Sequence, residues 1–153
     1  MIKRGQKAPE LKLTDSTGAS FKLSSLKGKT VVLYFYPKAD TPGCTTESCE
    51  FRDHSKAFAA KDAVIIGISP DTEKAQTKFQ KKYDLPFTLL ADADHVGAEA
   101  YGVWKEKSMY GRKYMGVART TYLIGPDGKV VKRWDGVKVP GHAEDVLAAV
   151  QQI

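Results

Sequence analysis

No apolar stretch in this sequence is long enough to cross a membrane as a helix. The longest apolar runs, Val31 to Tyr36 and Ala63 to Ile68, have six residues each, whereas a transmembrane helix needs about 20. The first seven residues carry positive charge with no apolar stretch behind them, so they resemble neither a secretory signal nor a transit peptide. We therefore expect a cytoplasmic protein without a membrane partner, folded as one domain over residues 1–153.

Blocks of like charge are also missing. Lys and Arg number 24 against 18 Asp and Glu, a net charge of +6, yet no run of basic residues is longer than two or three. Nucleic-acid binding is therefore disfavoured, since a dedicated binder concentrates its positive charge. The densest stretch, residues 105–119, has five basic residues against Glu106, and we interpret it as a solvated loop.

Cysteine is scarce, which excludes a disulfide framework of the kind that holds small secreted domains together. The two cysteines, Cys44 and Cys49, have the wrong spacing for a zinc knuckle and no second pair. We place His54 on a solvated helix face and interpret residues 92–95 as a helix-capping turn. No metal site is expected, and the two cysteines are either buried apolar residues or reagents.

The hydrophobic pattern predicts an α/β fold with a mixed central sheet, because β-like and helix-like segments alternate. A hairpin near residues 11–23 precedes a βαβαβ unit, and a second hairpin and a closing helix follow. The predicted strands are 31–36, 63–69, 88–91, 120–124 and 129–134, and the predicted helices are 45–62, one with its apolar stripe at 75, 79 and 83, and one that begins near 141.

Cys44 follows the strand at 31–36 after one short loop, at the start of a helix. A thiol there faces unpaired backbone N–H groups and the positive end of the helix dipole, and both favour the thiolate. The loop before it contributes the Thr41 hydroxyl, Pro42 and Gly43, which together suit an oxyanion cradle. The alternative is that Cys44 is a small buried apolar residue.

Cys49 lies five residues beyond Cys44. On an ideal helix their Cα atoms are about 8.7 Å apart, whereas a disulfide spans at most about 7 Å. A disulfide between them requires the start of the helix to unwind. We expect Thr45, Thr46 and Ser48 to ease unwinding, because such residues favour the helix weakly.

The pattern Pro37-x-x-x-Thr41-x-x-Cys44 resembles the active-site motif of peroxiredoxins. Residues 41–45 together with Cys49 are similar to the bacterioferritin comigratory protein branch, also called PrxQ. The similarity extends through residues 51–53, 67–71, 82–87, 101–104 and 119–124. Two departures are Ala39, where an acidic residue is frequent, and Ser48, where Ala is frequent.

The resemblance implies a thioredoxin-like fold with Cys44 as the peroxidatic cysteine and Cys49 as the resolving one. It places Arg119 beside the thiolate, and the alternative for this residue is one more charge in a basic loop. It also implies that Pro37 shields the site.

By the same resemblance, Thr41 and the backbone N–H groups of Gly43 and Cys44 hold the peroxide. Glu47 would support Arg119 through a hydrogen bond. An equally good interpretation of Glu47 is an acidic residue that stabilises a helix N-terminus.

The implied function is a thiol-dependent peroxidase for hydrogen peroxide and organic hydroperoxides. It would work through a sulfenic acid and an intramolecular disulfide, as a monomer, with thioredoxin or a similar dithiol protein as reductant and with no metal, haem or flavin. One alternative is a general thiol-disulfide oxidoreductase, although such enzymes favour Cys-x-x-Cys. Another is a chaperone or binding module with a vestigial site.

Overall fold

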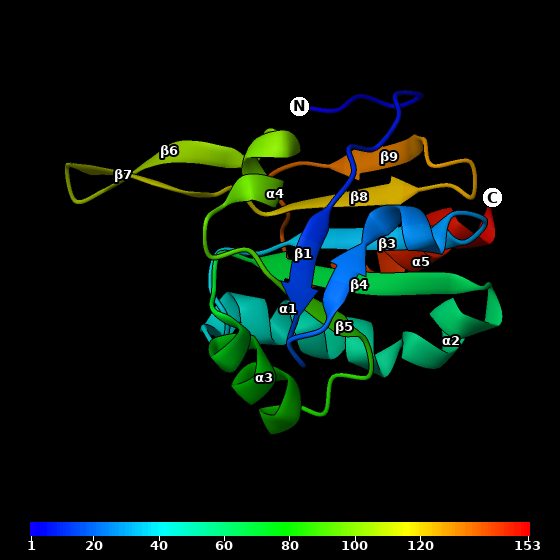
Figure 1. Ribbon diagram of the computed structural model, residues 1–153, viewed down its shortest axis with the longest axis horizontal. Coiled ribbons are helices and arrows are strands. Elements are labelled where there is room, and N and C mark those ends of the chain that lie inside the picture. Colours follow the sequence, from blue (N-terminus) through cyan, green and yellow to red (C-terminus); the bar gives the residue numbers. More distant parts are fainter.

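Seven strands form one mixed sheet in the computed structural model, which describes residues 1–153 (Figure 1). The strand order is β2-β1-β5-β4-β3-β8-β9, and β6 and β7 form a separate hairpin. The strands are β1 Lys12–Asp15, β2 Ser20–Lys22, β3 Thr30–Phe35, β4 Ala63–Ser69, β5 Thr88–Ala91, β6 Trp104–Met109, β7 Arg112–Val117, β8 Thr120–Ile124 and β9 Val130–Trp134. The helices are the short 3-10 helix η1 Leu23–Leu26, α1 Pro42–Asp53, α2 Ser55–Ala60, α3 Glu73–Lys82, α4 Val96–Ala100 and α5 His142–Gln151.

Strand β3 lies inside the sheet, parallel to β4 and antiparallel to β8. All six of its residues are buried, as its apolar and β-branched sequence predicts. Val31, Leu33 and Phe35 belong to the core on the side of α4. Val32 and Tyr34 belong to the core beneath α1, α2, α3 and α5. The predicted α/β architecture is therefore confirmed, with helices on both faces of the sheet (Figure 1).

The prediction of one helix over 45–62 is wrong, because two helices occupy this stretch. Helix α1 begins earlier, at Pro42, since a proline has no N–H to leave unpaired in the first turn. It ends at Asp53, and His54 lies between α1 and α2. His54 is therefore half-buried at a helix junction, with Nε2 3.9 Å from Glu144 Oε1, and not on a solvated helix face.

The prediction of a loop over 105–119 is also wrong. Strands β6 and β7 pair over six residues each, and the turn between them, Tyr110 and Gly111, has positive φ at both positions (52° and 77°). Two such residues close a tight hairpin whose twist matches its strands. The side chains beyond the base of the hairpin are mostly exposed. The sequence therefore lacks the alternation of apolar and polar residues by which a strand is usually predicted.

The predicted capping turn at residues 92–95 is confirmed. The Asp92 carboxylate accepts hydrogen bonds from the Gly97 and Ala98 N–H groups (3.0 and 2.9 Å), at the start of α4. Trp104 and Trp134 are half-buried and pack against the edges of the two cores. No helix is long and apolar enough to span a membrane.

The carboxyl end of β3 brings together segments that are far apart in the sequence. Phe35 pairs with Ile68 of β4 on one side and with Thr120 of β8 on the other. The loop after β3, the first turn of α1 and Arg119 therefore meet at this end of the sheet. In Figure 1 it is the end toward which the β6–β7 hairpin projects.

Candidate active site

The first turn of α1 holds Cys44 with its side chain fully buried. Thr41 is the N-cap residue, and its carbonyl accepts the first helical hydrogen bond, from the Thr45 N–H (2.8 Å). The N–H groups of Gly43 and Cys44 have no backbone acceptor. Cys44 therefore lies among free backbone donors at the positive end of the helix dipole, as the sequence predicts.

Arg119 bridges Cys44 and Glu47. Its Nη2 donates to Cys44 Sγ (3.3 Å), and its Nη1 donates to Glu47 Oε1 (2.7 Å). Gly43 permits this approach, because a Cβ there would lie 3.1 Å from Arg119 Nη2. One planar guanidinium thus holds the sulfur and the carboxylate together, a geometry that lysine does not reproduce.

Glu47 is the buried carboxylate of the site, with 1% of its surface exposed. Burial raises its pKa to about 7, although the charge of Arg119 and its hydrogen bond act in the opposite direction. Burial disfavours the charge of Arg119 too, but Glu47 and Cys44 raise the pKa of that guanidinium overall. Glu47 Oε2 has no hydrogen-bond partner, so the carboxylate relies on Arg119 alone for its polar contact.

Hydrogen bonds hold the loop that precedes α1 in place. Asp71, just after β4, accepts hydrogen bonds from the Ala39 N–H (2.8 Å) and from the Ser69 hydroxyl (2.7 Å). The Thr41 hydroxyl donates to the Lys38 carbonyl (2.8 Å). Pro37 and Thr41 are half-buried, so both predicted loop residues lie in a fixed loop next to the helix start.

Both cysteines are free thiols, and Cys49 is half-buried while Cys44 is buried. Ser48, the residue before Cys49, does not fit the prediction that it eases unwinding. Ser48 is fully buried, and its hydroxyl is hydrogen-bonded to the Tyr34 hydroxyl of β3 (2.8 Å). Helix propensity describes only the isolated helix, whereas this hydrogen bond connects α1 to β3 of the sheet. Ser48 therefore stabilises the wound helix, and that part of the prediction is wrong.

One residue near the site escapes sequence reasoning. Lys107, on β6, is half-buried although its neighbours Glu106 and Ser108 are exposed. Burial and the nearby charge of Arg119 lower the pKa of Lys107, while Cys44 opposes this. The Lys107 side chain is therefore within electrostatic range of Cys44 and Arg119. No signal in the sequence could have found it, because its position depends on where the hairpin lies relative to the first turn of α1.

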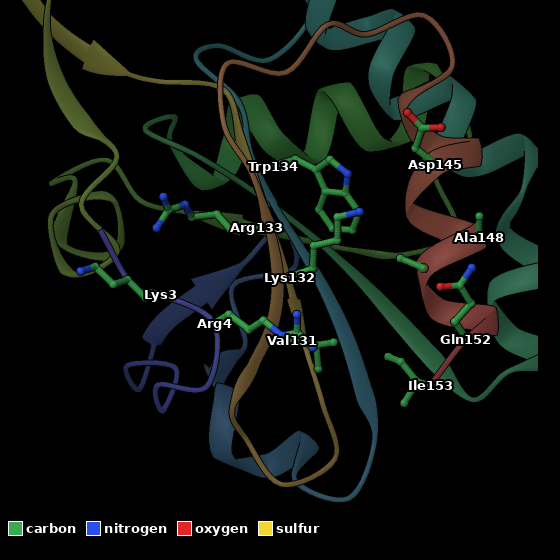
Figure 2. Close-up of a pocket in the computed structure, with 11 residues that line it drawn as sticks. Lys3, Arg4, Val131, Lys132, Arg133, Trp134, Asp145, Ala148, Gln152 and Ile153 are labelled. Carbon is green, nitrogen blue, oxygen red and sulfur yellow. The ribbon is translucent and has the colours of Figure 1, made fainter.

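The largest hollow of the surface is not at this site. It has a volume of about 950 Å³ and lies between β9, α5 and the N-terminal segment (Figure 2). Its lining includes Lys3, Arg4, Trp134 and Gln152 but none of the residues around Cys44. No group of His, Cys, Asp and Glu side chains in the protein could hold a metal ion.

A cysteine at the start of the helix that follows the central strand, beside a guanidinium in a thioredoxin-like fold, defines a cysteine-based redox enzyme. The chain belongs to the AhpC/TSA family, which matches residues 4–133. Peroxiredoxin Bcp of Bacillus subtilis (strain 168) is 51% identical over 99% of this chain and 97% of its own length.

Two solved structures agree with this assignment. A mutant of PrxQ from Xylella fastidiosa has a TM-score of 0.94 and 36% identity, over 99% of this chain and 97% of that one. The bacterioferritin comigratory protein of Xanthomonas campestris, described in a study of its alkyl peroxide reduction activity, has a TM-score of 0.89 and 42% identity over 93% of this chain and 90% of that one. The predicted fold and enzyme class are confirmed. This protein is a thiol-dependent peroxidase of the peroxiredoxin type.

Proposed function

We propose that Cys44 is the peroxidatic cysteine and Cys49 the resolving cysteine of this peroxidase. The observation that carries the assignment is the contact of Arg119 Nη2 with Cys44 Sγ at 3.3 Å. A guanidinium within hydrogen-bond distance favours a thiolate, which is the nucleophilic form of cysteine. Cys49 has no comparable contact with Arg119, and it is more exposed.

In the first step the Cys44 thiolate attacks one oxygen of the peroxide. An S–O bond forms, the O–O bond breaks, and the departing oxygen leaves as water or an alcohol once it takes up a proton. Arg119 and the N–H groups of Gly43 and Cys44 stabilise the charge that develops on the oxygens, and the Thr41 hydroxyl joins them by turning its hydrogen away from the Lys38 carbonyl. Donors fixed in advance stabilise such a transition state more than water does.

In the second step the Cys49 sulfur displaces the oxygen of the Cys44 sulfenic acid. A disulfide forms and water leaves. Because both cysteines belong to α1, this step needs the start of the helix to unwind. A dithiol protein such as thioredoxin then reduces the disulfide and is itself oxidised to a disulfide.

Glu47 and Pro37 have supporting roles in this proposal. Glu47 holds Arg119 in place through the 2.7 Å contact, and Pro37 shields the thiolate from solvent. We propose a monomer, since the resolving cysteine comes from the same chain. We also place the protein in the cytoplasm, where a reducing environment maintains the free thiols that the cycle needs.

The substrates we propose are hydrogen peroxide and organic hydroperoxides. Alkyl peroxide reduction by the Xanthomonas relative supports the second class. The test is peroxide consumption coupled to thioredoxin recycling, with hydrogen peroxide and cumene hydroperoxide compared.

Two variants assign the cysteines in that assay, and two more test Thr41 against a neighbouring control. Cys44→Ser should abolish turnover, and Cys49→Ser should consume one equivalent of peroxide and then stop with thioredoxin. A Cys44→Ser protein that still turns over peroxide would overturn the assignment. Thr41→Val should lower the rate constant for peroxide, whereas the neighbouring Thr45→Val should leave it close to that of the wild type.

A further inference from the structure

The β6–β7 hairpin projects from the body of the protein (Figure 1). It pairs with no strand of the main sheet. Its base is fixed, because Val103 and Val117 are buried in the core and the Ala118 N–H donates to the Val103 carbonyl (2.8 Å). Most residues beyond the base are exposed. The hairpin is therefore anchored at its base and exposed to solvent next to the site.

The hairpin exposes apolar side chains that a monomeric domain normally buries. Tyr110 at the turn is 98% exposed, and Met109 and Tyr114 on the strands are 57% and 44% exposed. Tyrosine and methionine are enriched in protein interfaces, and clustered exposed apolar residues mark interaction sites. Four of the seven large apolar side chains exposed in the whole protein belong to this one hairpin.

The two faces of the hairpin differ in charge. Side chains alternate between faces along a strand, and the pairing places Lys105 opposite Gly116, Lys107 opposite Tyr114, and Met109 opposite Arg112. These residues form one face, which we call the site-side face: Lys105, Lys107, Met109, Arg112 and Tyr114. It has three cations, two apolar side chains and no acid, since Glu106 lies on the opposite face.

Lys107, on the site-side face, is close enough to the site for the charges of Arg119 and Cys44 to act on it. The Lys107 stem folds back across Gly116, where a Cβ would lie 3.4 Å from Lys107 Cδ. This direction leads along β7 to Arg119, two residues beyond the strand. Any protein that delivers a thiol to a Cys44–Cys49 disulfide from this side therefore meets the face.

We infer that the site-side face docks the reducing protein, and that this partner presents an acidic surface beside its dithiol. The inference rests on the proposed function, in which a dithiol protein reduces the Cys44–Cys49 disulfide. Three cations without an acid attract an acidic surface and repel a second copy of the same face. Tyr114 and Met109 supply apolar contact. One thiolate of the partner attacks the disulfide, which forms a mixed disulfide with one cysteine and frees the other as a thiolate. The second thiol of the partner then attacks the mixed disulfide, so that the partner leaves as a disulfide and Cys44 and Cys49 are both reduced.

The experiment compares two reductants at saturating peroxide, a thioredoxin with an acidic surface and the small reagent dithiothreitol. The double variant Lys105→Glu with Arg112→Glu should lower kcat/KM for thioredoxin by about tenfold, since charge complementarity sets the association rate. Turnover with dithiothreitol should stay within about twofold of the wild type. Tyr114→Ser should also lower kcat/KM for thioredoxin.

The opposite face of the hairpin supplies matched controls. Lys113→Glu changes the charge equally on the same ribbon, and Met115→Ser removes an exposed apolar side chain there. Both should leave kcat/KM for thioredoxin within about twofold of the wild type. If the site-side variants use thioredoxin as well as the wild type does, or the controls lose as much, the docking inference is wrong and the peroxidase stands.

Two further outcomes have defined meanings. A wild-type protein that consumes no peroxide with either reductant would overturn the proposed function and the docking inference with it. A dimer in sedimentation that Arg112→Glu dissociates would assign the face to a second copy, which also overturns the inference.

Discussion

Replacing Ser48 with alanine should protect this enzyme from irreversible oxidation. The hydroxyls of Ser48 and Tyr34 are hydrogen-bonded to each other at 2.8 Å, and both side chains are fully buried. Ser48 lies between the two cysteines, so this contact must break when α1 unwinds to bring Cys49 to Cys44. The bond therefore lengthens the time for which a Cys44 sulfenic acid waits, and a waiting sulfenic acid reacts with a second peroxide to give sulfinic acid.

The size of the effect follows from the burial of the pair. Ser48→Ala leaves the Tyr34 hydroxyl buried and unpaired, which costs the wound helix about 1–3 kcal/mol. Alanine favours the helix over serine by about 0.5 kcal/mol, which acts in the opposite direction. The free energy of unwinding is therefore lowered by about 0.5–2.5 kcal/mol in Ser48→Ala, which raises the unwound population roughly twofold to sixtyfold.

A double-mutant cycle separates this bond from packing. Tyr34→Phe keeps the ring stacked on Phe51, whose centroid is 4.8 Å away, but removes the hydroxyl. The double variant Ser48→Ala with Tyr34→Phe leaves no unpaired group, and replacing both partners is nearly neutral. It should return close to wild-type behaviour, whereas additive effects would point to packing alone.

The assay is mass spectrometry after a timed pulse of excess peroxide, which gives the ratio of sulfinic acid to disulfide. Ser48→Ala should lower that ratio. Thr46→Ala is the control, because the exposed Thr46 hydroxyl bonds only within the helix, to the Pro42 carbonyl (3.0 Å). A ratio in Ser48→Ala that equals or exceeds that of the wild type would refute the argument.

Three further predictions concern the charged groups of the site and its surroundings. Arg119→Ala should lower the rate constant for peroxide by roughly a hundredfold or more, and Arg119→Lys by less; wild-type rates for both in stopped-flow kinetics would contradict the role of Arg119. The pKa of Glu47 is raised to about 7, so the folded protein binds this proton more tightly than the unfolded chain does. The wild type should therefore lose about 3 kcal/mol of stability relative to Glu47→Gln as the pH rises from about 4.5 to 7. Urea unfolding at several pH values tests this, and the same pH dependence of stability in both proteins would exclude it. Burial is the main reason that the pKa of His142 is lowered to about 4, so the unfolded chain binds this proton more tightly than the folded protein does. The wild type should therefore lose stability relative to His142→Gln as the pH falls from about 6.5 through 4. Thermal unfolding at several pH values measures this difference.

Much of the fold is predictable because its strands are continuous apolar runs. The predicted strands at 63–69, 88–91 and 120–124 coincide with β4, β5 and β8. Burial on both faces demands an unbroken run of β-branched and aromatic residues, and such runs are visible without tertiary information. The position of Cys44 at a helix start follows equally directly from the strand and loop before it.

What sequence reasoning missed depends on contacts between distant segments. Arg119 comes within reach of Cys44 only because β8 pairs with β3, and without the family resemblance its charge is one among many. The effect of Ser48 has the wrong sign in the prediction because its partner, Tyr34, is on β3. The hairpin is missed since both of its faces are solvated and its turn residues, Tyr110 and Gly111, are not the common Asn-Gly.

In the proposed cycle, the reaction at Cys44 weakens a contact that holds its own helix. Arg119 contacts both the Cys44 sulfur and Glu47, and both of these residues belong to α1. A hydrogen bond to a charged partner contributes about 1.5–3 kcal/mol, but the sulfenic acid that follows attack is neutral. The contact of Arg119 with the sulfur therefore loses most of its strength just when the helix must unwind.

This reasoning predicts faster hydrogen exchange in α1 after oxidation, before any disulfide exists. In Cys49→Ser, the amides of residues 44–50 should exchange faster in the sulfenic acid form than in the reduced form. Helix α3 lacks such a contact and serves as the internal reference. In Arg119→Ala the reduced form should already exchange fast, and oxidation should add little. Equal exchange in the two oxidation states of Cys49→Ser would show that unwinding is independent of the charge on Cys44, and the Tyr34–Ser48 bond would then be the dominant restraint.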